Sequence, residues 1–244
     1  MSDRRSTVSG VPGRTVRRAL VMAGIGGLTA AGLLGPGAAS AQAAACPDVE
    51  VVFARGTAEP AGLGRVGQAF VDELRSDLGG RTVGTYAVNY PASYDFLQSA
   101  PQGADDAARV QATAASCPAT SIALGGYSQG AAVVDLISAD PGATFGFGRP
   151  MPAAVADHVA AVAVFGNPAG RIGRTLTSAS PLYGAKTIDL CNGADPVCSN
   201  GDDRPAHSRY VEGGFPTQAA DFVAAKIGKH APSDVMINAS GSVG

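Results

Sequence analysis

The sequence carries little charge, and its positive and negative residues nearly cancel. Only 16% of the 244 residues are Asp, Glu, Lys or Arg, and the formal net charge at pH 7 is -2. A nucleic-acid surface needs an excess of basic side chains, so this balance gives no electrostatic reason to expect a nucleic-acid partner. The hydrophobic share of 45% is typical of a globular protein with a buried core.

The sequence also lacks a good membrane span. Its apolar N-terminal segment, residues 19–34, is short and interrupted by glycine, so we expect no stable membrane insertion. Basic residues precede this segment and the small residues AASAQAAA follow it, a pattern typical of an export signal. We therefore predict a signal peptide over residues 1–45, one domain over 46–230 and a flexible polar tail over 231–244. The Arg17-Arg18 pair leaves the twin-arginine route open beside the general export route.

Cysteines are few, and they lack the CxxC spacing of zinc sites. The histidines do not cluster with them, so we expect neither a metal nor an organic cofactor. All four cysteines follow residue 45, and an even number in an exported protein predicts two disulfides. Three pairings exist on paper; the short spacing of Cys191 and Cys198 favours a local bridge, which leaves Cys46 to pair with Cys117. A lipidated N-terminal Cys46 is the competing interpretation.

Short apolar runs alternate with segments of helical periodicity along the rest of the chain. This alternation predicts an α/β protein with a parallel sheet, and no internal repeat or second domain is evident. The segment 90–103 is rich in aromatic residues for a connection, and it either packs on the domain or forms an exposed apolar rim round a site. The predicted strands are 48–54, 82–89, a run centred on 122–124, 159–165 and 186–190; the predicted helices are 65–78, 104–116, the segment after Ser128 and 217–229; residues 141–152 are predicted to be irregular.

Residues 120–137, TSIALGGYSQGAAVVDLI, change from a buried-strand pattern to a helical pattern within a few residues. The apolar run 122–124 comes first, and GYSQG follows as a GxSxG motif in its required context of strand, sharp turn and helix. A Cβ atom at Gly126 or Gly130 would collide with neighbouring backbone in so tight a turn. We predict that Ser128 is a nucleophile exposed at the carboxyl edge of the sheet. A surface serine in a glycine-rich turn is the alternative.

A serine hydroxyl needs a base to take its proton, and the base needs a third group to hold its tautomer. Three histidines follow residue 45. His158 precedes a strand, where we expect a structural or surface role, and His230 lies in the predicted tail. His207 follows the last strand, which is where an α/β-hydrolase places its base, so we predict that His207 is the base.

The acidic partner should lie between Ser128 and His207, because α/β-hydrolases have the chain order Ser, acid, His. Asp195 lies in the ring that the predicted Cys191–Cys198 bridge would close, and an orienting carboxylate needs such rigidity. We therefore predict Asp195 as the partner of His207. The other aspartates suit other places: Asp189 lies within the last strand, and Asp202 and Asp203 suit a solvated polar loop.

Acyl transfer also requires donors that stabilise a tetrahedral oxyanion. The backbone N–H of Gln129, at the start of the helix after Ser128, is the first predicted donor. Thr57, which follows the first strand, is the second and offers both an N–H and a hydroxyl. A plain turn residue is the alternative interpretation of Thr57.

Four motifs together resemble the cutinase family, with the greatest similarity to its actinobacterial secreted members. They are RGTAEP (55–60), GGYSQGA (125–131), FGNP (165–168) and CNGADPVC (191–198), the last followed by PAH ending at His207. The resemblance implies a three-layer α/β/α sandwich with a central, mainly parallel five-stranded sheet, an exposed serine without a full lid, and hydrolysis of carboxylic esters. It implies the same triad, Ser128, Asp195 and His207, the same oxyanion hole, Thr57 and Gln129, and the bridges Cys46–Cys117 and Cys191–Cys198.

One segment departs from the pattern of the family's plant-pathogen members. The resemblance implies that those members carry an apolar flap just before the catalytic histidine. Here the segment 199–206, SNGDDRPA, carries three charges, which favours soluble or dispersed esters over a polyester film. The apolar segments Phe96-Leu97 and Phe145–Phe147 could still hold an acyl chain. We thus predict a secreted, monomeric serine esterase for short- to medium-chain esters, including cutin-like polyesters or lipids. Acetylxylan or phospholipid esters on the same fold, or a non-catalytic surface protein, are the alternatives.

Overall fold

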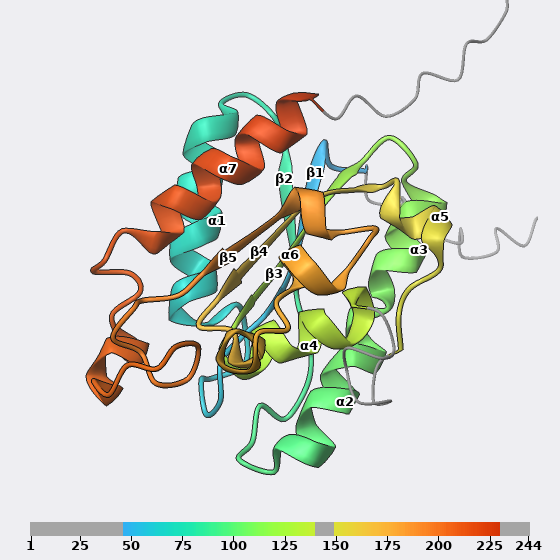
Figure 1. Cartoon of the computed structure of the whole chain (residues 1–244). Helices are drawn as coiled ribbons and strands as arrows, with labels where there is room; N and C mark the ends of the chain where they lie inside the picture. The colour runs from blue at the N-terminus through green and yellow to red at the C-terminus, as the bar shows by residue number, and fades with distance from the viewer. Residues whose placement is uncertain (1–45, 140–148, 230–244) are drawn as a thin grey trace, which may run out of the picture. The chain divides into compact units, whose positions relative to one another are not determined.

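The computed structural model of the chain describes residues 46–139 and 149–229, and these contain one five-stranded sheet (Figure 1). Neighbouring strands pair in parallel in the order β2-β1-β3-β4-β5. The predicted parallel α/β sheet is thereby confirmed, with each predicted strand present. The strands are β1 (Val49–Ala54), β2 (Val83–Ala87), β3 (Ser121–Tyr127), β4 (Val159–Phe165) and β5 (Thr187–Leu190).

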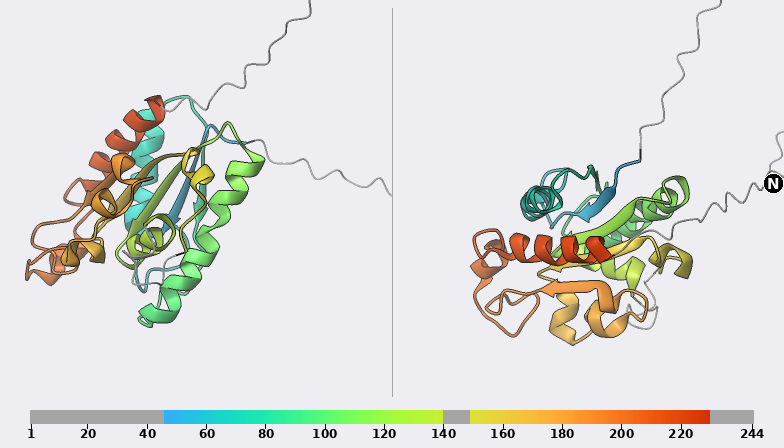
Figure 2. Two further views of the ribbon diagram at one scale, coloured as in Figure 1. Left: turned by 45° about the vertical axis from the view of Figure 1, so that its right-hand side comes forward. Right: turned by 90° about the horizontal axis from the view of Figure 1, so that it is seen from above.

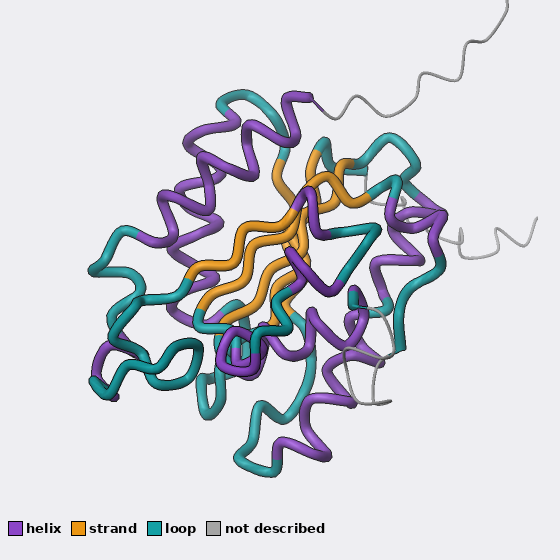
Figure 3. Tube along the Cα trace, viewed as in Figure 1, coloured by secondary structure: helices purple, strands orange, loops and turns teal. Residues whose placement is uncertain are grey.

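Helices cover both faces of this sheet, as the three-layer prediction requires (Figure 2). Helices α1 and α7 contact each other on one face, while α2 and α4 contact each other on the other. The strands therefore lie between two sets of helices (Figure 3). The helices are α1 (Gly64–Leu78), α2 (Phe96–Ala107), α3 (Arg109–Ser116), α4 (Gln129–Ser138), α5 (Ala153–Ala156), α6 (Leu176–Ala179) and α7 (Phe215–Lys229), with short 3₁₀ turns η2 (Pro168–Ile172), η3 (Gly184–Lys186) and η4 (Arg204–Ser208).

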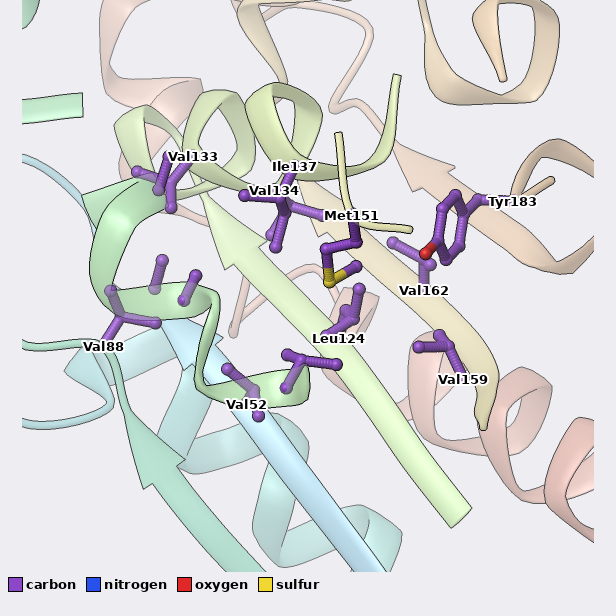
Figure 4. Packing of buried hydrophobic residues seen from close by; sticks show 14 of the residues in the cluster. Val52, Val88, Leu124, Val133, Val134, Ile137, Met151, Val159, Val162 and Tyr183 are labelled. Carbon is purple, nitrogen blue, oxygen red and sulfur yellow. The ribbon is translucent and has the colours of Figure 1, made fainter. Parts of the chain in front are cut away.

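Strand β1 shows why the sheet needs helices on both faces. Its residues are all buried, and successive side chains point to opposite faces. Phe53 packs in the core under α1 and α7, whereas Val52 packs in the core under α2 and α4. Figure 4 shows the second core, where Leu124 of β3 lies below Val134 of α4. Each such side chain stabilises the fold by about 1.5–3 kcal/mol through its burial.

The strand order places a crevice between the carboxyl ends of β1 and β3. From β1 the chain crosses to β2 on one side, and it then returns to β3 on the other side of β1. Connections that leave two adjacent strands in opposite directions open a crevice at that edge, where α/β proteins bind ligands. The segment from Arg55 follows β1, and Ser128 follows β3. The predicted nucleophile and the predicted Thr57 loop are therefore neighbours at the switch point.

Two disulfides close the domain at separate places. Cys46, just before β1, is bonded to Cys117 after α3, and Cys191 is bonded to Cys198 in the loop after β5. Both predicted pairings are present, and no cysteine in the described part of the chain is free. Because Cys46 is disulfide-bonded in this structure, its thiol is not available for lipidation.

The prediction of a loop over 90–103 and one helix over 104–116 is wrong in part: residues 90–95 connect and 104–116 is mostly helical, but the helix starts earlier and is divided. Helix α2 begins at Phe96 and contains Pro101, and a break at Ala108 separates it from α3. A proline in a helix usually ends it, so the sequence indicated a connection. The helix forms because small residues at helical spacing pack against α4: Ala100, Gly103, Ala104 and Ala107.

Several predictions lie wholly or partly outside the described residues. These are the signal peptide over 1–45, the irregular segment 141–152 as far as residue 148, and the tail 231–244. The residues Phe145–Phe147 and His230 belong to the same group.

Candidate active site

Ser128 lies on a sharp corner between β3 and α4. Its backbone has φ 56° and ψ -116°, a conformation that is strained for a residue with a side chain. The surrounding backbone holds it, since the Ser128 N–H donates to the carbonyl of Phe165 at 2.8 Å. A Cβ on Gly126 would lie 2.2 Å from the carbonyl oxygen of Gly130, and one on Gly130 would lie 1.9 Å from that of Ala54. The steric explanation of the GxSxG glycines is thus confirmed.

The structure brings the three predicted triad side chains together. Nε2 of His207 lies 2.8 Å from Oγ of Ser128, and Nδ1 of His207 lies 2.6 Å from Oδ2 of Asp195. A carboxylate only accepts hydrogen bonds, so Nδ1 carries the proton of a neutral imidazole and Nε2 is left to accept from the serine hydroxyl. This tautomer is the one that a general base toward Ser128 requires.

Asp195 is completely buried, and donors surround its carboxylate. Oδ2 accepts from the hydroxyl of Tyr210 at 2.8 Å as well as from His207, and Oδ1 accepts from the backbone N–H of Val197 at 2.8 Å. The Ser199 hydroxyl donates to the carbonyl of Asp195 at 2.8 Å. The three bonds to the carboxylate compensate the desolvation of a buried charge and hold it in one orientation, while the Ser199 bond fixes the backbone of Asp195.

Two tyrosines that sequence reasoning missed pack against the imidazole. The ring of Tyr127 stacks on His207 with centroids 5.1 Å apart, and its hydroxyl donates to the backbone carbonyl of His207. Tyr210 meets the imidazole edge-on at 6.2 Å. Burial raises the pKa of Tyr127 to about 12, so its hydroxyl stays a neutral donor. Tyr127 lies inside GYSQG, but no pattern marks Tyr210.

The predicted oxyanion donors line the same pocket as Ser128. The side chain of Gln129 is engaged elsewhere, because its Oε1 accepts from Ser99 and its Nε2 donates to the carbonyl of Ser93. Its backbone N–H, at the start of α4, has no acceptor within the described residues, and neither does that of Thr57. Two unpaired N–H groups beside a serine hydroxyl are what a developing oxyanion requires.

The loop that carries Thr57 is held by Arg55, whose side chain is almost fully buried. Its guanidinium donates to the carbonyls of Glu59 at 2.9 Å and Tyr90 at 2.7 Å, and the Tyr90 hydroxyl donates to the carbonyl of Arg55. A carboxylate oxygen of Glu59 accepts from the N–H of Gly56 at 2.7 Å. The motif RGTAEP therefore folds into a cross-bonded turn that presents Thr57 to the pocket.

The pocket above Ser128 has a volume of about 790 Å³ and is mostly apolar. The aromatic segment predicted as either packed or exposed does both: Tyr90 is buried, whereas Tyr94 and Leu97 expose about three quarters of their surface. Tyr94 also lines the pocket, so the apolar rim is present. The apolar lining consists of Tyr94, Phe96, Ala100, Ala132, Pro168 and Val197, and the charged side chains in the lining are Glu59 and Arg65.

The buried carboxyl group of Asp135 and the half-buried one of Asp189 share a partner and do not belong to the triad. Nδ2 of Asn167 donates to Asp135 at 3.3 Å and to Asp189 at 3.1 Å. Burial, and then the charge of Asp189, raise the pKa of Asp135 well above its usual range. Burial raises the pKa of Asp189 to about 6, against a lowering by the bond from Asn167. Asp189 thus contacts Asn167 rather than His207, in keeping with its predicted place inside β5.

His158 lies away from this edge of the sheet. It precedes β4, so it is at the amino end of a parallel strand, and its carbonyl accepts from the N–H of Ile122. Ser128 follows the carboxyl end of β3, the strand next to β4. His158 therefore cannot serve Ser128 as a base, and the structural role predicted for it fits its position.

The described residues contain neither a cluster of metal-ligating side chains nor a membrane-spanning helix. Over 46–139 and 149–229, no three His, Cys, Asp or Glu side chains gather in a way that could hold a metal ion. Within the same residues, no helix is both long enough and apolar enough to cross a membrane.

The parallel sheet, the serine on a strand-to-helix corner and the crevice above it define an α/β-hydrolase fold of the kind that hydrolyses carboxylic esters. The family model named Cutinase matches residues 45–227, and the chain belongs to this family. It is a cutinase-like carboxylic ester hydrolase.

Individual relatives agree with this assignment. A phospholipase of Mycobacterium tuberculosis, Culp4, is 54% identical over 80% of this chain and 85% of its own length. The carboxylesterase Culp1 of Mycobacterium bovis is 51% identical over 78% of this chain and 87% of its own length. A Trichoderma reesei cutinase in complex with a phosphonate inhibitor is 36% identical with a TM-score of 0.60, covering 75% of this chain and 77% of its own. An acetyl xylan esterase structure is 26% identical with a TM-score of 0.66, covering 75% and 100%.

Proposed function

We propose that the protein is a secreted serine esterase in which Ser128 is the nucleophile, His207 the general base and Asp195 the group that orients His207. Thr57 and Gln129 form the oxyanion hole. The observation that carries the proposal is the unbroken hydrogen-bond chain from Ser128 through His207 to Asp195 at the floor of an open pocket. The reaction needs neither a metal nor an organic cofactor.

Acylation begins when Nε2 of His207 takes the proton of the Ser128 hydroxyl as Oγ attacks the ester carbonyl carbon. The carbonyl oxygen becomes an oxyanion, which accepts hydrogen bonds from the N–H groups of Gln129 and Thr57. In other enzymes each such donor stabilises the transition state by about 3–4 kcal/mol. Nε2–H then donates its proton to the leaving alcohol oxygen, and the C–O bond breaks. The result is an acyl group on Ser128 and a free alcohol.

Deacylation repeats these steps with water. His207 takes a proton from water as the water oxygen attacks the acyl carbonyl, and the oxyanion forms in the same place. Collapse returns the proton from Nε2 to Oγ of Ser128 and releases the carboxylic acid. Asp195 stabilises the imidazolium during both steps and keeps Nδ1 protonated.

Covalent labelling tests the triad directly. We expect a phosphonate ester to add one group to the protein, on the peptide that contains Ser128, with loss of activity toward p-nitrophenyl butyrate. Ser128→Ala should abolish labelling and activity, and His207→Ala should slow labelling by about 10⁴-fold or more. Full esterase activity in Ser128→Ala, or labelling on another peptide, would overturn the proposal.

For the substrate, we propose short- to medium-chain esters in solution or dispersion. The apolar lining can hold an acyl chain, while the segment 199–206 before His207 is charged, and its Asp203 pairs with Arg209. A charged flap resists adsorption to an oily interface. Comparing p-nitrophenyl esters of increasing chain length with a polyester film tests this; much faster film hydrolysis would contradict it. Acetylated polysaccharide and phospholipid should be included, because relatives are named for those activities.

Secretion is part of the proposal and rests on residues 1–45 together with the disulfides. Two bridges in a chain of this kind favour an oxidising compartment. We expect a cleaved N-terminus near residue 46 in the culture medium or the cell wall, found by N-terminal sequencing, and a monomer by analytical ultracentrifugation. An uncleaved protein confined to the cytosol would contradict secretion without affecting the esterase proposal.

A further inference from the structure

The pocket lining contains two charged side chains that the proposed reaction does not use, Glu59 and Arg65. Both carboxylate oxygens of Glu59 accept from backbone N–H groups, those of Gly56 at 2.7 Å and Arg65 at 2.8 Å, so Glu59 is fixed in the loop. Arg65, at the start of α1, also lines the pocket, and about half of its side chain is exposed. Among the described lining residues, Arg65 is the only lysine or arginine.

Arg65 lies on the side of the pocket that receives the leaving alcohol. Its Nη2 donates to the backbone carbonyl of Ser208, the residue after His207. Because Nε2 of His207 must deliver a proton to the alcohol oxygen, the alcohol portion of the ester lies toward His207. A group attached to that alcohol within a few bonds of the ester oxygen would come close to the guanidinium.

We propose that Arg65 forms an anion-binding subsite for the alcohol portion of the substrate, so that the enzyme prefers esters whose alcohol carries a phosphate or carboxylate. The inference rests on the proposed function and names the substrate class of that same site. A guanidinium presents several N–H donors in one plane, which matches the paired oxygens of either anion.

Glu212 occupies this subsite in the structure. Its Oε1 accepts from Nη1 of Arg65 at 2.9 Å, and its side chain is 61% exposed. An exposed ion pair contributes little stability, so an anionic substrate can replace the carboxylate of Glu212 on Arg65. Glu212 therefore acts as an internal competitor, and its removal should favour anionic esters. This opposite effect separates a binding role of Arg65 from a merely structural one.

Three chromogenic esters whose leaving groups all carry a nitro group para to the ester oxygen test the subsite. One is neutral, p-nitrophenyl butyrate; one has the anion on the alcohol, 5-butanoyloxy-2-nitrobenzoate; and one has it on the acyl chain, mono-p-nitrophenyl glutarate. The readout is the ratio of kcat/KM for each anionic ester to kcat/KM for the neutral one, at low and at high salt. A general loss of triad geometry lowers both kcat/KM values of a variant alike, so it leaves their ratio unchanged.

We expect Arg65→Gln to lower the ratio for the alcohol-side anion by about fivefold, and Arg65→Lys to lower it less. Glu212→Gln should raise the same ratio by about two- to fivefold, and high salt should reduce it in the wild type. Arg209→Gln is the matched control: Arg209 pairs with Asp203 and does not line the pocket, so the ratio should stay the same. The acyl-side ratio should respond to none of these changes.

Esters of glycerol 3-phosphate and of hydroxy acids, each compared with its neutral parent, tell whether phosphate or carboxylate is preferred; a preference for either supports the subsite. Equal ratios in wild type, Arg65→Gln and Glu212→Gln overturn it, as does an effect confined to the acyl-side anion. If Arg65→Gln does not fold, the rise expected in Glu212→Gln still decides. Absence of hydrolysis of the neutral ester by the wild type would instead refute the proposed function.

Discussion

The hydroxyl of Tyr210 donates a 2.8 Å hydrogen bond to Oδ2 of Asp195, the oxygen that also accepts from Nδ1 of His207. Tyr210 is fully buried, and its hydroxyl accepts in turn from the N–H of Asn192 at 3.2 Å. The phenol thus links the start of the loop after β5 to the carboxylate that is bonded to the proposed base. It acts through its bond to Asp195 and its edge-on contact with the ring of His207, which makes it a positioning residue.

Replacing Tyr210 with Phe should lower kcat/KM for a neutral ester by about fivefold and the free energy of unfolding by about 1–2 kcal/mol, because Asp195 loses one of its donors. Steady-state kinetics over a pH series and urea unfolding measure both. Tyr183→Phe is the matched control: Tyr183 is equally buried, but its hydroxyl has no hydrogen-bond partner within the described residues. That variant should keep its activity and be as stable as the wild type or more so. Equal losses in both variants would show that Tyr210 acts by packing alone.

Asp189→Asn should stabilise the protein at neutral pH. Burial raises the pKa of Asp189 to about 6 in the folded chain, from an ordinary 3.8, so the folded state holds a proton that the unfolded state has released between these values. The stability that this group contributes is present below about pH 4 and is lost as the pH rises through about 6. At pH 8 the loss is as much as about 3 kcal/mol.

Urea unfolding of wild type and Asp189→Asn from pH 4 to pH 8 measures this difference. The amide oxygen can still accept from Asn167, so the bond at this position is kept. Asp77→Asn, at an exposed position on α1, serves as the control and should change the curve little. A wild type and variant whose stabilities differ by the same amount at every pH would contradict the assignment.

The two disulfides should have different roles. Cys46 and Cys117 are 71 positions apart, and in the chain-entropy model their bridge stabilises the folded state by about 4 kcal/mol. Cys191 and Cys198 are 7 positions apart, and the same model gives their bridge about 2 kcal/mol of stabilisation. We expect Cys46→Ser with Cys117→Ser to lose mainly stability. Cys191→Ser with Cys198→Ser should lose less stability but about tenfold in kcat/KM, because the ring holds Asp195.

Thermal unfolding and ester kinetics on the two double variants, at a temperature where both are folded, separate these effects. Each double variant is the control for the other. An unchanged kcat/KM in the variant without the 191–198 bridge would show that Tyr210, Val197 and Ser199 position Asp195 without it.

Gly130→Ala should abolish activity and lower the free energy of unfolding by about 3 kcal/mol or more. Its Cβ would lie 1.9 Å from the carbonyl oxygen of Ala54, and neither backbone segment can move without displacing β1 or the serine corner. Gly80→Ala is the control, since its Cβ would meet no atom within 4 Å. Circular dichroism melting and ester kinetics compare the two. An active, stable Gly130→Ala would refute the steric account of the motif.

The sequence by itself predicted the order of the strands and the three side chains that the structure brings together, Ser128, His207 and Asp195. Buried parallel strands are nearly continuous apolar runs, and Val159–Phe165 is such a run, so the pattern is visible without coordinates. GYSQG was equally informative, because its glycines are required by local backbone geometry. Local patterns of this kind are encoded by neighbouring residues and need no knowledge of the fold.

The tertiary structure alone decided the features that depend on residues far apart in the chain. Helix α2 forms despite Pro101 because its small residues fit against α4, and their helical spacing does not show by itself that such a partner is present. Tyr210 reaches Asp195, and Arg65 reaches Ser208 and Glu212, only once the strands and loops are assembled. The same holds for Asn167, which joins the carboxyl groups of Asp135 and Asp189. Their roles arise from desolvation and from distances across the fold, which single positions in a sequence do not express.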